Sequence, residues 1–264
     1  MYEFNYQKAG SVADAAAKVA GADDGTLMAG GMTLIPTLKQ RLAMPSDVVD
    51  IGQLADLQGI SVAGGKVSIG SMTTHDTVAN SADVKGAIPA LTVLASGIGD
   101  PMVRNRGTMG GSVANNDPAA DYPGAVLGLG ATVVTDKREI AGDDFFTGMF
   151  ETALDEGEII TRIDFPVPTK AAYTKFPNPA SRYAIVGVFV AQTADGVRVA
   201  VTGAGGTAFR ATEMEAALNA NFSPSALDGI SVSADGLNKD IHASAEYRAH
   251  LIGVMAKRAV AACG

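Results

Sequence analysis

The sequence has few of the residues that bind metals or clusters. A single cysteine, Cys263, lies beside the C-terminus, and the three histidines are scattered at His75, His242 and His250. One thiol cannot form an internal disulfide, a zinc site or an iron–sulfur cluster. The histidines have no metal-ligand spacing either. The sequence therefore predicts no metal site in this chain.

Positive charge and long apolar runs are also scarce. The 264 residues include 28 acidic and 20 basic side chains, for a net charge of −8, which argues against nucleic acid or an anionic membrane as a general partner. No apolar run reaches the ~18 residues that a membrane helix needs. Residues 1–6 have neither a basic leader nor an apolar core. We therefore expect a cytoplasmic protein with no membrane insertion.

Two glycine-rich motifs are prominent. Residues 29–34 read Ala-Gly-Gly-Met-Thr-Leu, and residues 108–112 read Thr-Met-Gly-Gly-Ser. Consecutive backbone amides without bulky side chains can bind a phosphate oxygen. A lone glycine pair is more often a structural turn, but two such motifs suit the two phosphates of a dinucleotide. The Rossmann fingerprint is absent, because no Gly-x-Gly-x-x-Gly opens a helix after the first strand.

The hydrophobic pattern predicts small units that mix helix and strand. In residues 1–52 we expect a β-α-β-α-β lobe, whose first helix begins at a capping box headed by Ser11. A glycine pair at residues 64–65 lies between two alternating segments and predicts a hairpin. Thr74 predicts a helix cap. Residues 99–123 are too rich in Gly, Asn, Asp and Pro to be ordinary helix or strand.

The clearest domain boundary is the Pro-Val-Pro sequence at residues 166–168. We expect one domain over residues 1–168, with lobes of about 1–52 and 53–168, and a second over residues 169–264. In the second, strand-like segments precede two helices, the last of them amphipathic. This order suggests an α+β domain with helices on one face of its sheet.

Two groups of charged residues allow more than one interpretation. Arg104 and Arg106 could contact a phosphate or a redox partner, but such arginines more often orient a loop by pairing with carboxylates, here Asp100 or Asp117. Six carboxylates between residues 143 and 158 indicate a solvated surface rather than a catalytic pair. They are Asp143, Asp144, Glu151, Asp155, Glu156 and Glu158.

Several motifs together resemble the FAD-binding (medium) subunits of molybdenum hydroxylases, the group of aerobic carbon monoxide dehydrogenase and xanthine dehydrogenase. The resemblance runs over most of the chain. The matching motifs are Ala29-Gly30-Gly31-x-Thr33-Leu34, Val103-Arg104-Asn105-Arg106-Gly107-Thr108-Met109-Gly110-Gly111-Ser112, Asp121-x-Pro123, Asp144-Phe145-Phe146-x-Gly148, Glu158-Ile159-Ile160-x-x-Ile163-x-Phe165-Pro166 and Arg182-Tyr183-Ala184-Ile185-Val186.

This resemblance implies a fold and a cofactor position. It implies an α+β fold with the two-lobed FAD-binding architecture of vanillyl-alcohol oxidase, followed by a C-terminal α+β domain with a three-stranded sheet and helices. FAD would lie between the lobes, with its diphosphate on the two glycine motifs.

The resemblance also implies roles for individual residues. The first glycine motif would contribute Ala29, Gly30, Gly31, Met32, Thr33 and Leu34, and the second Thr108, Gly110, Gly111 and Ser112. Gly99 would lie near the cofactor and Ile160 would make an apolar contact. Asp121 would bind the adenosine end, where a ribose diol offers donors to a carboxylate. Lys175 would lie near the flavin ring, and Tyr183 would pack on the isoalloxazine. Met32 departs from the family, because many relatives carry histidine there. No catalytic side chain is expected.

The implied function is electron transfer. The chain would take electrons from the [2Fe–2S] clusters of a small partner subunit and pass them to quinone, NAD or oxygen. The molybdenum cofactor would lie on a large partner subunit that oxidises carbon monoxide, a purine, an N-heterocycle or an aldehyde, in a dimer of heterotrimers. Two alternatives stay open: a self-sufficient NAD(P)H-dependent flavin reductase of the peptidoglycan-synthesis type, and a non-redox nucleotide-binding assembly subunit.

Overall fold

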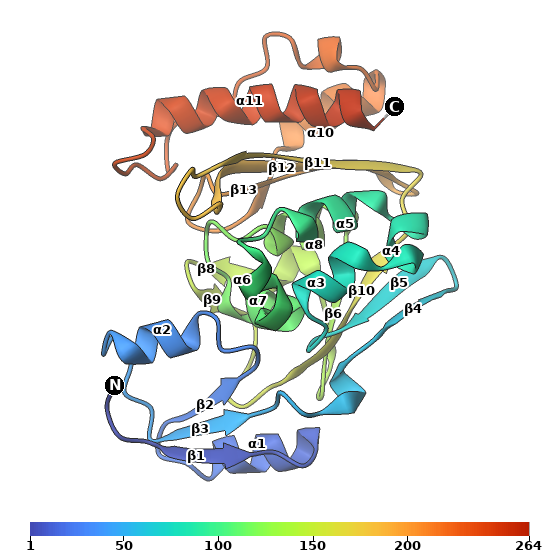
Figure 1. Ribbon diagram of the computed structural model, residues 1–264. Helices are drawn as coiled ribbons and strands as arrows, with labels where there is room; N and C mark the ends of the chain where they lie inside the picture. Colours follow the sequence, from blue (N-terminus) through green and yellow to red (C-terminus); the bar gives the residue numbers. More distant parts are fainter. Residues whose placement is uncertain (264) are drawn as a thin grey trace.

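The computed structural model describes residues 1–263. Three units are stacked along the long axis in the order of the sequence, with the N-terminal lobe at one end and the C-terminal unit at the other (Figure 1). Each contains a sheet with helices packed on it, so the predicted α+β class is confirmed. No helix within residues 1–263 is long and apolar enough to span a membrane.

The N-terminal lobe is a small parallel sheet with two helices. Its elements are β1 (Asn5–Lys8), α1 (Val12–Ala20), β2 (Gly25–Met28), α2 (Leu34–Lys39) and β3 (Asp47–Asp50). The strands pair in the order β1-β3-β2. The Ser11 hydroxyl accepts a hydrogen bond from the Asp14 N–H, which confirms the predicted cap of α1. The buried side of α1 packs into the core of this lobe through Ala15 and Val19.

The middle lobe is a five-stranded antiparallel sheet, in the order β4-β5-β10-β6-β7, with short helices around it. Its elements are η1 (Ala55–Leu57), β4 (Ile60–Ala63), β5 (Lys66–Gly70), α3 (His75–Asn80), α4 (Ala82–Ala87), α5 (Pro89–Ser96), α6 (Pro101–Arg106), α7 (Met109–Asn115), α8 (Tyr122–Leu129), β6 (Thr132–Thr135), β7 (Glu139–Ala141), α9 (Gly142–Phe145), β8 (Phe146–Gly148), β9 (Glu151–Thr152) and β10 (Ile160–Pro166). Gly64 and Gly65 turn the predicted β4–β5 hairpin with φ of 58° and 75°. Thr74 caps α3 as expected.

The glycine-rich stretch 99–123 is more regular than its composition predicts. It contains α6, α7 and the beginning of α8. The expectation that this stretch would form no ordinary helix is therefore wrong. Asp100 caps α6 by accepting from the Val103 N–H at 2.8 Å, and Pro101 occupies the first turn, where its missing N–H costs nothing. Thr108 caps α7 in the same way. These caps offset the low helix propensity of glycine.

The C-terminal unit is an antiparallel sheet between two layers of helices. Its elements are β11 (Lys170–Pro177), β12 (Ala184–Thr193), β13 (Gly196–Thr202), β14 (Phe209–Arg210), α10 (Thr212–Ala220), η2 (Pro224–Leu227) and α11 (Ala245–Ala262). The three long strands match the expectation, but the two-residue β14 adds a fourth. Helix α11 covers the outer face, and α5 and α8 cover the inner face (Figure 1). The domain's own helices, α10 and α11, therefore pack on one face of its sheet as expected, and the middle lobe covers the other face.

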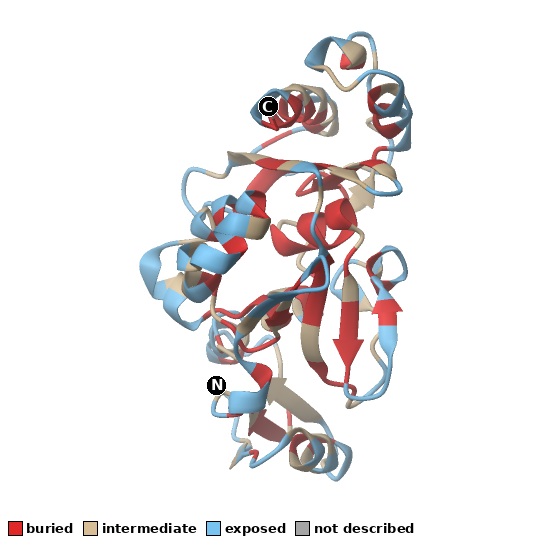
Figure 2. Ribbon diagram, turned by 90° about the vertical axis from the view of Figure 1, so that its right-hand side faces the viewer, coloured by how far each residue is buried: buried red, intermediate tan, exposed pale blue. Residues whose placement is uncertain are grey.

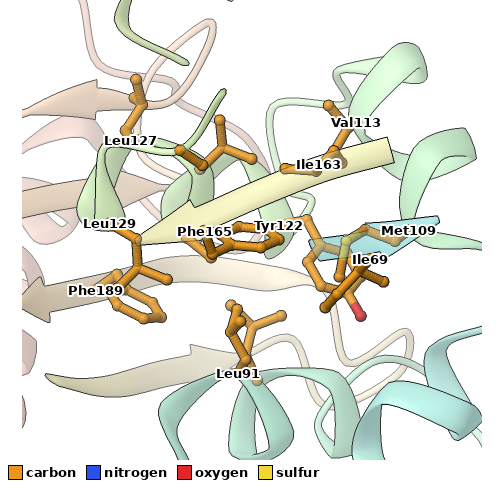
Figure 3. Packing of buried hydrophobic residues seen from close by; sticks show 14 of the residues in the cluster. Ile69, Leu91, Met109, Val113, Tyr122, Leu127, Leu129, Ile163, Phe165 and Phe189 are labelled. Carbon is orange, nitrogen blue, oxygen red and sulfur yellow. The ribbon is translucent and has the colours of Figure 1, made fainter. Parts of the chain in front are cut away.

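One hydrophobic core joins the middle lobe to the C-terminal sheet. All eight residues of α8 are buried, and Tyr122 lies among Phe165 of β10, Leu91 of α5 and other apolar side chains (Figure 3). Phe189 of β12 belongs to the same cluster. Figure 2 shows the buried residues gathered through the middle of the molecule. Each large side chain buried here contributes about 1.5–3 kcal/mol, so the C-terminal sheet is stabilised by the middle lobe.

The single cysteine lies at the end of this arrangement. Cys263 follows α11 and is buried, with its Sγ 3.9 Å from the carbonyl oxygen of Val190 on β12. Burial raises the pKa of this thiol to about 11. The described residues contain no group of three or more His, Cys, Asp or Glu side chains that could hold a metal ion.

Candidate functional site

A pocket of about 560 Å³ lies where the N-terminal lobe meets the middle lobe. Its volume is typical of small-molecule and cofactor sites. Both glycine motifs line it. The structure brings all the predicted site residues except Lys175 to its walls, namely Ala29, Gly30, Gly31, Met32, Thr33, Leu34, Gly99, Thr108, Gly110, Gly111, Ser112, Asp121, Ile160 and Tyr183.

The first glycine motif presents free backbone donors. It connects β2 to α2, and Gly31 adopts φ of 73°, a conformation that favours glycine. Within residues 1–263, no protein group accepts a hydrogen bond from the N–H of Gly30, Gly31, Met32 or Thr33. Successive amides ahead of a helix form an anion-binding concavity. This motif can therefore hold a phosphate.

The second glycine motif is built differently. It forms the first turn of α7, where the Gly110 N–H donates to the Ser71 carbonyl at 2.8 Å and the Gly111 N–H donates to the Thr108 hydroxyl at 3.2 Å. The expected open nest of amides is therefore wrong at this motif, because its donors already have partners in the chain. The motif can still offer a ligand the Ser112 hydroxyl and a smooth surface of glycine backbone.

Close backbone packing explains why glycine stands in both motifs. A Cβ on Gly30 would lie 1.9 Å from the Arg106 carbonyl oxygen, and a Cβ on Gly110 would lie 2.4 Å from the Ser71 Cβ. A Cβ on Gly111 would lie 2.8 Å from the Thr108 hydroxyl oxygen and 3.4 Å from the Cβ of Ala29. The two motifs thus touch each other, and their glycines set the separation of the lobes at the pocket.

Asp121 and Lys175 form a buried pair, in which Asp121 lines the pocket and Lys175 lies behind it. Lys175 Nζ lies 3.0 Å from Asp121 Oδ1 and donates to the Gly97 carbonyl at 2.8 Å. The Tyr173 hydroxyl also donates to Asp121. Burial raises the pKa of Asp121, and Lys175 opposes that rise. The resemblance predicted Asp121 for a ribose and Lys175 for the flavin ring. In the structure the Asp121 carboxylate contacts both Lys175 and Tyr173, which the sequence did not indicate.

Arg104 orients a loop, but not through the expected carboxylates. Its guanidinium donates to the carbonyl oxygens of Ile98 and Gly99, each at 3.1 Å. The expected pairing with Asp100 or Asp117 is therefore wrong. Arg104 fixes the turn at Gly99, whose φ of 49° again favours glycine. This turn forms part of the pocket rim.

Tyr183 closes another side of the pocket. The residue remains 41% exposed, and burial of the rest, together with the nearby Asp117 and Asp121 carboxylates, raises the pKa of its hydroxyl. The neighbouring Arg182 has φ of 64° and donates to the Gly99 carbonyl at 3.2 Å. Tyr183 is thus an aromatic side chain that is held at the pocket mouth with free surface for a ligand.

The structure adds two polar residues that sequence reasoning missed. Ser71 and His75 line the pocket, and in the described part of the chain neither Ser71 Oγ nor His75 Nδ1 has a hydrogen-bond partner. Burial, with a smaller effect of Arg104, lowers the pKa of His75 to about 4, so the imidazole is neutral at physiological pH. No local pattern marks these residues, since their neighbours Gly107 and Gly110 lie far along the chain.

Glu158 is a buried anchor of the pocket rather than a surface carboxylate. It is 4% exposed and pairs with Arg138 Nη2 at 2.9 Å, while the Thr135 hydroxyl and the Asp155 N–H also donate to it. The solvated-surface interpretation is therefore wrong for Glu158. The Arg138 guanidinium, aided by the other two donors and opposed by burial, lowers the pKa of Glu158 to about 2.

This shift predicts a loss of stability in acid. Because the folded protein favours the ionised carboxylate, its contribution is complete above the ordinary value of 4.5 and is lost as the pH falls toward 2. We expect this contribution to reach about 3 kcal/mol at most. Urea unfolding measures the free energy of unfolding at each pH. Between about pH 6 and 3, this free energy should fall less in Glu158→Gln than in the unmodified chain. Glu156→Gln changes an exposed carboxylate nearby and should keep the pH dependence of the unmodified chain. If Glu158→Gln also keeps that pH dependence, Glu158 is not the group responsible for it.

Comparison with known proteins identifies the family of this chain. Residues 2–168 match the family described as the FAD binding domain in molybdopterin dehydrogenase, and residues 171–263 match the CO dehydrogenase flavoprotein C-terminal domain. The nicotine 6-hydroxylase medium subunit of Paenarthrobacter nicotinovorans is 36% identical, over 98% of this chain and 96% of the relative. The glyceraldehyde dehydrogenase medium chain of Sulfolobus acidocaldarius is 35% identical, over 81% and 80%.

Solved structures give the same result. The Cu,Mo-CO dehydrogenase in its cyanide-inactivated form matches with a TM-score of 0.91 at 32% identity, over 100% of this chain and 98% of that chain. Quinoline 2-oxidoreductase from Pseudomonas putida 86 matches with a TM-score of 0.89 at 27% identity, over 99% and 96%. The two family models together cover most of the chain, and the solved structures share its fold. The chain therefore belongs to the FAD-binding medium subunits of the molybdenum hydroxylases.

Proposed function

We propose that this chain holds FAD in the pocket between its first two lobes and transfers electrons from iron–sulfur clusters of a partner subunit to an external acceptor. The observation that carries the proposal is the row of free amides at residues 30–33 on the wall of a pocket of about 560 Å³. In an acidic chain, local backbone dipoles rather than net charge must attract a diphosphate. Family membership supports the same cofactor.

The residues at the pocket fit such a cofactor. The amides of the first glycine motif would donate to the diphosphate, and Ser112 would add a hydroxyl from the second motif. Tyr183 offers an aromatic surface for a ring, and stacking of this kind contributes about 0.5–1.5 kcal/mol beyond area burial. Bound FAD would supply the ability to take electrons singly and release them in pairs, while the chain binds, orients and shields it.

Asp121 would act from the pocket wall, and Lys175 would support it from behind. Their pair joins α8 to β11 and fixes the Gly97 carbonyl beside the pocket. We assign them to positioning the wall, with Lys175 holding a positive charge near the cofactor without facing the pocket. Ser71 and His75 would offer polar atoms on the middle-lobe side.

The electron donor must lie on another chain, because the sequence contains one cysteine and cannot ligate a cluster alone. We propose a small iron–sulfur subunit and a large molybdenum subunit as partners, in a dimer of heterotrimers in the cytoplasm. Relatives are named for nicotine, glyceraldehyde and carbon monoxide. This breadth is what we expect if the large subunit selects the substrate.

Flavin uptake tests the proposal directly. We expect the purified chain to retain FAD, or to take it up with quenching of flavin fluorescence, at a stoichiometry of one. NADPH alone should reduce that flavin slowly, whereas reduction should be rapid once the cluster and molybdenum subunits are added with their substrate. A chain that binds no FAD under any condition would end the proposal. Rapid reduction by NADPH alone would favour the flavin-reductase alternative instead.

A further inference from the structure

The pocket has two chemically different ends. Leu27, Ile51 and Ile159 line the end that adjoins the hydrophobic core of the N-terminal lobe. Asp121 and Tyr183 line the end beside the C-terminal unit, because Asp121 contacts β11 and Tyr183 immediately precedes β12. One end is therefore closed by apolar side chains, and the other combines a carboxylate with an aromatic ring.

The open end of the pocket suits the flavin ring of FAD. Electrons must reach this ring and leave it, so the ring needs the part of the pocket that lies near the surface. Tyr183 keeps much of its surface exposed, whereas Ile51 and Ile159 are buried. With the ring beside Tyr183, the adenine would lie at the apolar end. Asp121 would then face the ring rather than the ribose of the adenosine.

Asp121 stands where an aspartate ordinarily caps a helix, but its side chain is used differently. It directly precedes α8, and within the described residues no backbone N–H of α8 donates to its carboxylate. Aspartate at this position normally accepts such a bond. The carboxylate is instead engaged by two side chains of β11, and the residue lines the pocket.

The contacts of this carboxylate leave part of it free for a ligand. Lys175 Nζ lies 3.0 Å from Oδ1 and 3.1 Å from Oδ2, and the Tyr173 hydroxyl donates to Oδ1. An ionised carboxylate accepts about four hydrogen bonds. Within residues 1–263, Oδ2 accepts from Lys175 alone. It can therefore accept one more bond, from a donor in the pocket.

Tyr173 reaches Asp121 from behind the pocket. It lies on β11, is buried, and does not belong to the described residues that line the pocket. Its hydroxyl lies against Gly187 of β12, where a Cβ would be only 2.3 Å away, so the glycine provides the room for this contact. Tyr173 can therefore affect a ligand only through Asp121.

We infer that the Asp121 carboxylate binds the imide N–H on the pyrimidine edge of the flavin ring, and that Tyr173 is a positioning residue for this carboxylate. The inference rests on the proposed function. The imide N–H is a donor, and an ionised carboxylate only accepts, so the two are complementary. Burial raises the pKa of Asp121, but Lys175 and Tyr173 oppose that rise and so favour the accepting form.

Calorimetric titration of the FAD-free chain with FAD, N3-methyl-FAD and ADP tests this inference. N3-methyl-FAD lacks the imide N–H and should bind at least about tenfold more weakly than FAD, since the lost bond has a charged acceptor. Tyr173→Phe should weaken FAD by about fivefold and leave N3-methyl-FAD unchanged, so that the chain discriminates less between them. ADP carries the diphosphate and the adenosine without the flavin ring, and should bind Tyr173→Phe as it binds the unmodified chain.

Tyr6→Phe is the matched control. It also removes a hydroxyl that donates to a carboxylate, that of Asp50, but neither residue belongs to the described residues that line the pocket. This variant should bind all three compounds as the unmodified chain does. An equal loss of FAD affinity in Tyr6→Phe would show that the effect is not specific to Asp121, and would overturn the role of Tyr173.

The outcomes separate the two proposals. Equal binding of FAD and N3-methyl-FAD by the unmodified chain overturns the imide contact and leaves the cofactor site intact. Full discrimination in Tyr173→Phe overturns the positioning role. If Tyr173→Phe weakens ADP as much as FAD, Asp121 acts on the adenosine or on the whole pocket, which also overturns the inference. A chain that binds no FAD overturns the proposed function and this inference with it.

Discussion

Gly30→Ala should weaken FAD binding by at least about 100-fold. The added Cβ would lie 1.9 Å from the Arg106 carbonyl oxygen and 2.7 Å from its carbon, and both atoms belong to backbone that cannot rotate away. The first glycine motif must then move by about an ångström or more. Because each hydrogen bond to a charged group is worth about 1.5–3 kcal/mol, losing two such bonds to a diphosphate is enough for this effect.

The same change should also cost about 1–3 kcal/mol of folding stability, since overpacking strains the contact between the lobes. Flavin fluorescence gives the dissociation constant, and thermal unfolding gives the stability. Gly86→Ala is the matched control, because a Cβ there meets nothing within 4 Å in helix α4. It should leave FAD affinity unchanged and stabilise the helix slightly. If Gly30→Ala retains FAD within about threefold, the first motif does not hold the diphosphate.

Asp121→Asn should strongly destabilise the chain. It leaves the Lys175 ammonium, 9% exposed, without a counter-charge in a low-dielectric site. Removing one partner of a buried pair typically costs about 3–5 kcal/mol, which for a chain of this size lowers the melting temperature by about 10 °C. Differential scanning calorimetry measures this loss. FAD uptake should fall as well, because the Gly97 carbonyl and the pocket wall lose their support.

A double-mutant cycle distinguishes this pair from an ordinary surface contact. Lys175→Met alone should cost less than Asp121→Asn, because a buried carboxyl with a raised pKa can take up a proton. The double variant should be more stable than the sum of the single losses predicts. Lys257→Met serves as the control, since its pair with Asp228 is 39% and 69% exposed and should contribute about 0–1 kcal/mol. Additive losses at Asp121 and Lys175 would show that the two side chains are not coupled.

Features with local signals could be predicted from the sequence. The caps at Ser11 and Thr74, the glycine-pair hairpin and the β-α-β-α-β lobe were each indicated by neighbouring residues, and the structure has them. The same local logic, applied fully, would have found the helices of residues 99–123 through the caps at Asp100 and Thr108. Amino-acid composition did not predict these helices, because a capping residue can begin a helix even in a glycine-rich sequence.

Features that depend on distant residues could not be predicted in the same way. The pairing of Asp121 with Lys175, and the donor Tyr173, follow from the packing of the C-terminal sheet on α8. Glu158 reads as one of six surface acids until Arg138 and Thr135 are brought against it. Ser71 and His75 become part of the pocket only because α7 packs on the end of β5. In each case the tertiary contact, rather than the local pattern, assigns the role.

The position of Cys263 bears on tolerance of oxygen. Flavoproteins that meet oxygen when reduced release hydrogen peroxide, which attacks thiolates far faster than thiols. In the folded chain this sulfur is shielded beneath the last helix, and its pKa of about 11 keeps it protonated. The single sulfhydryl of the chain is therefore poorly reactive in the folded state, and sulfenylation would require local opening at the end of α11.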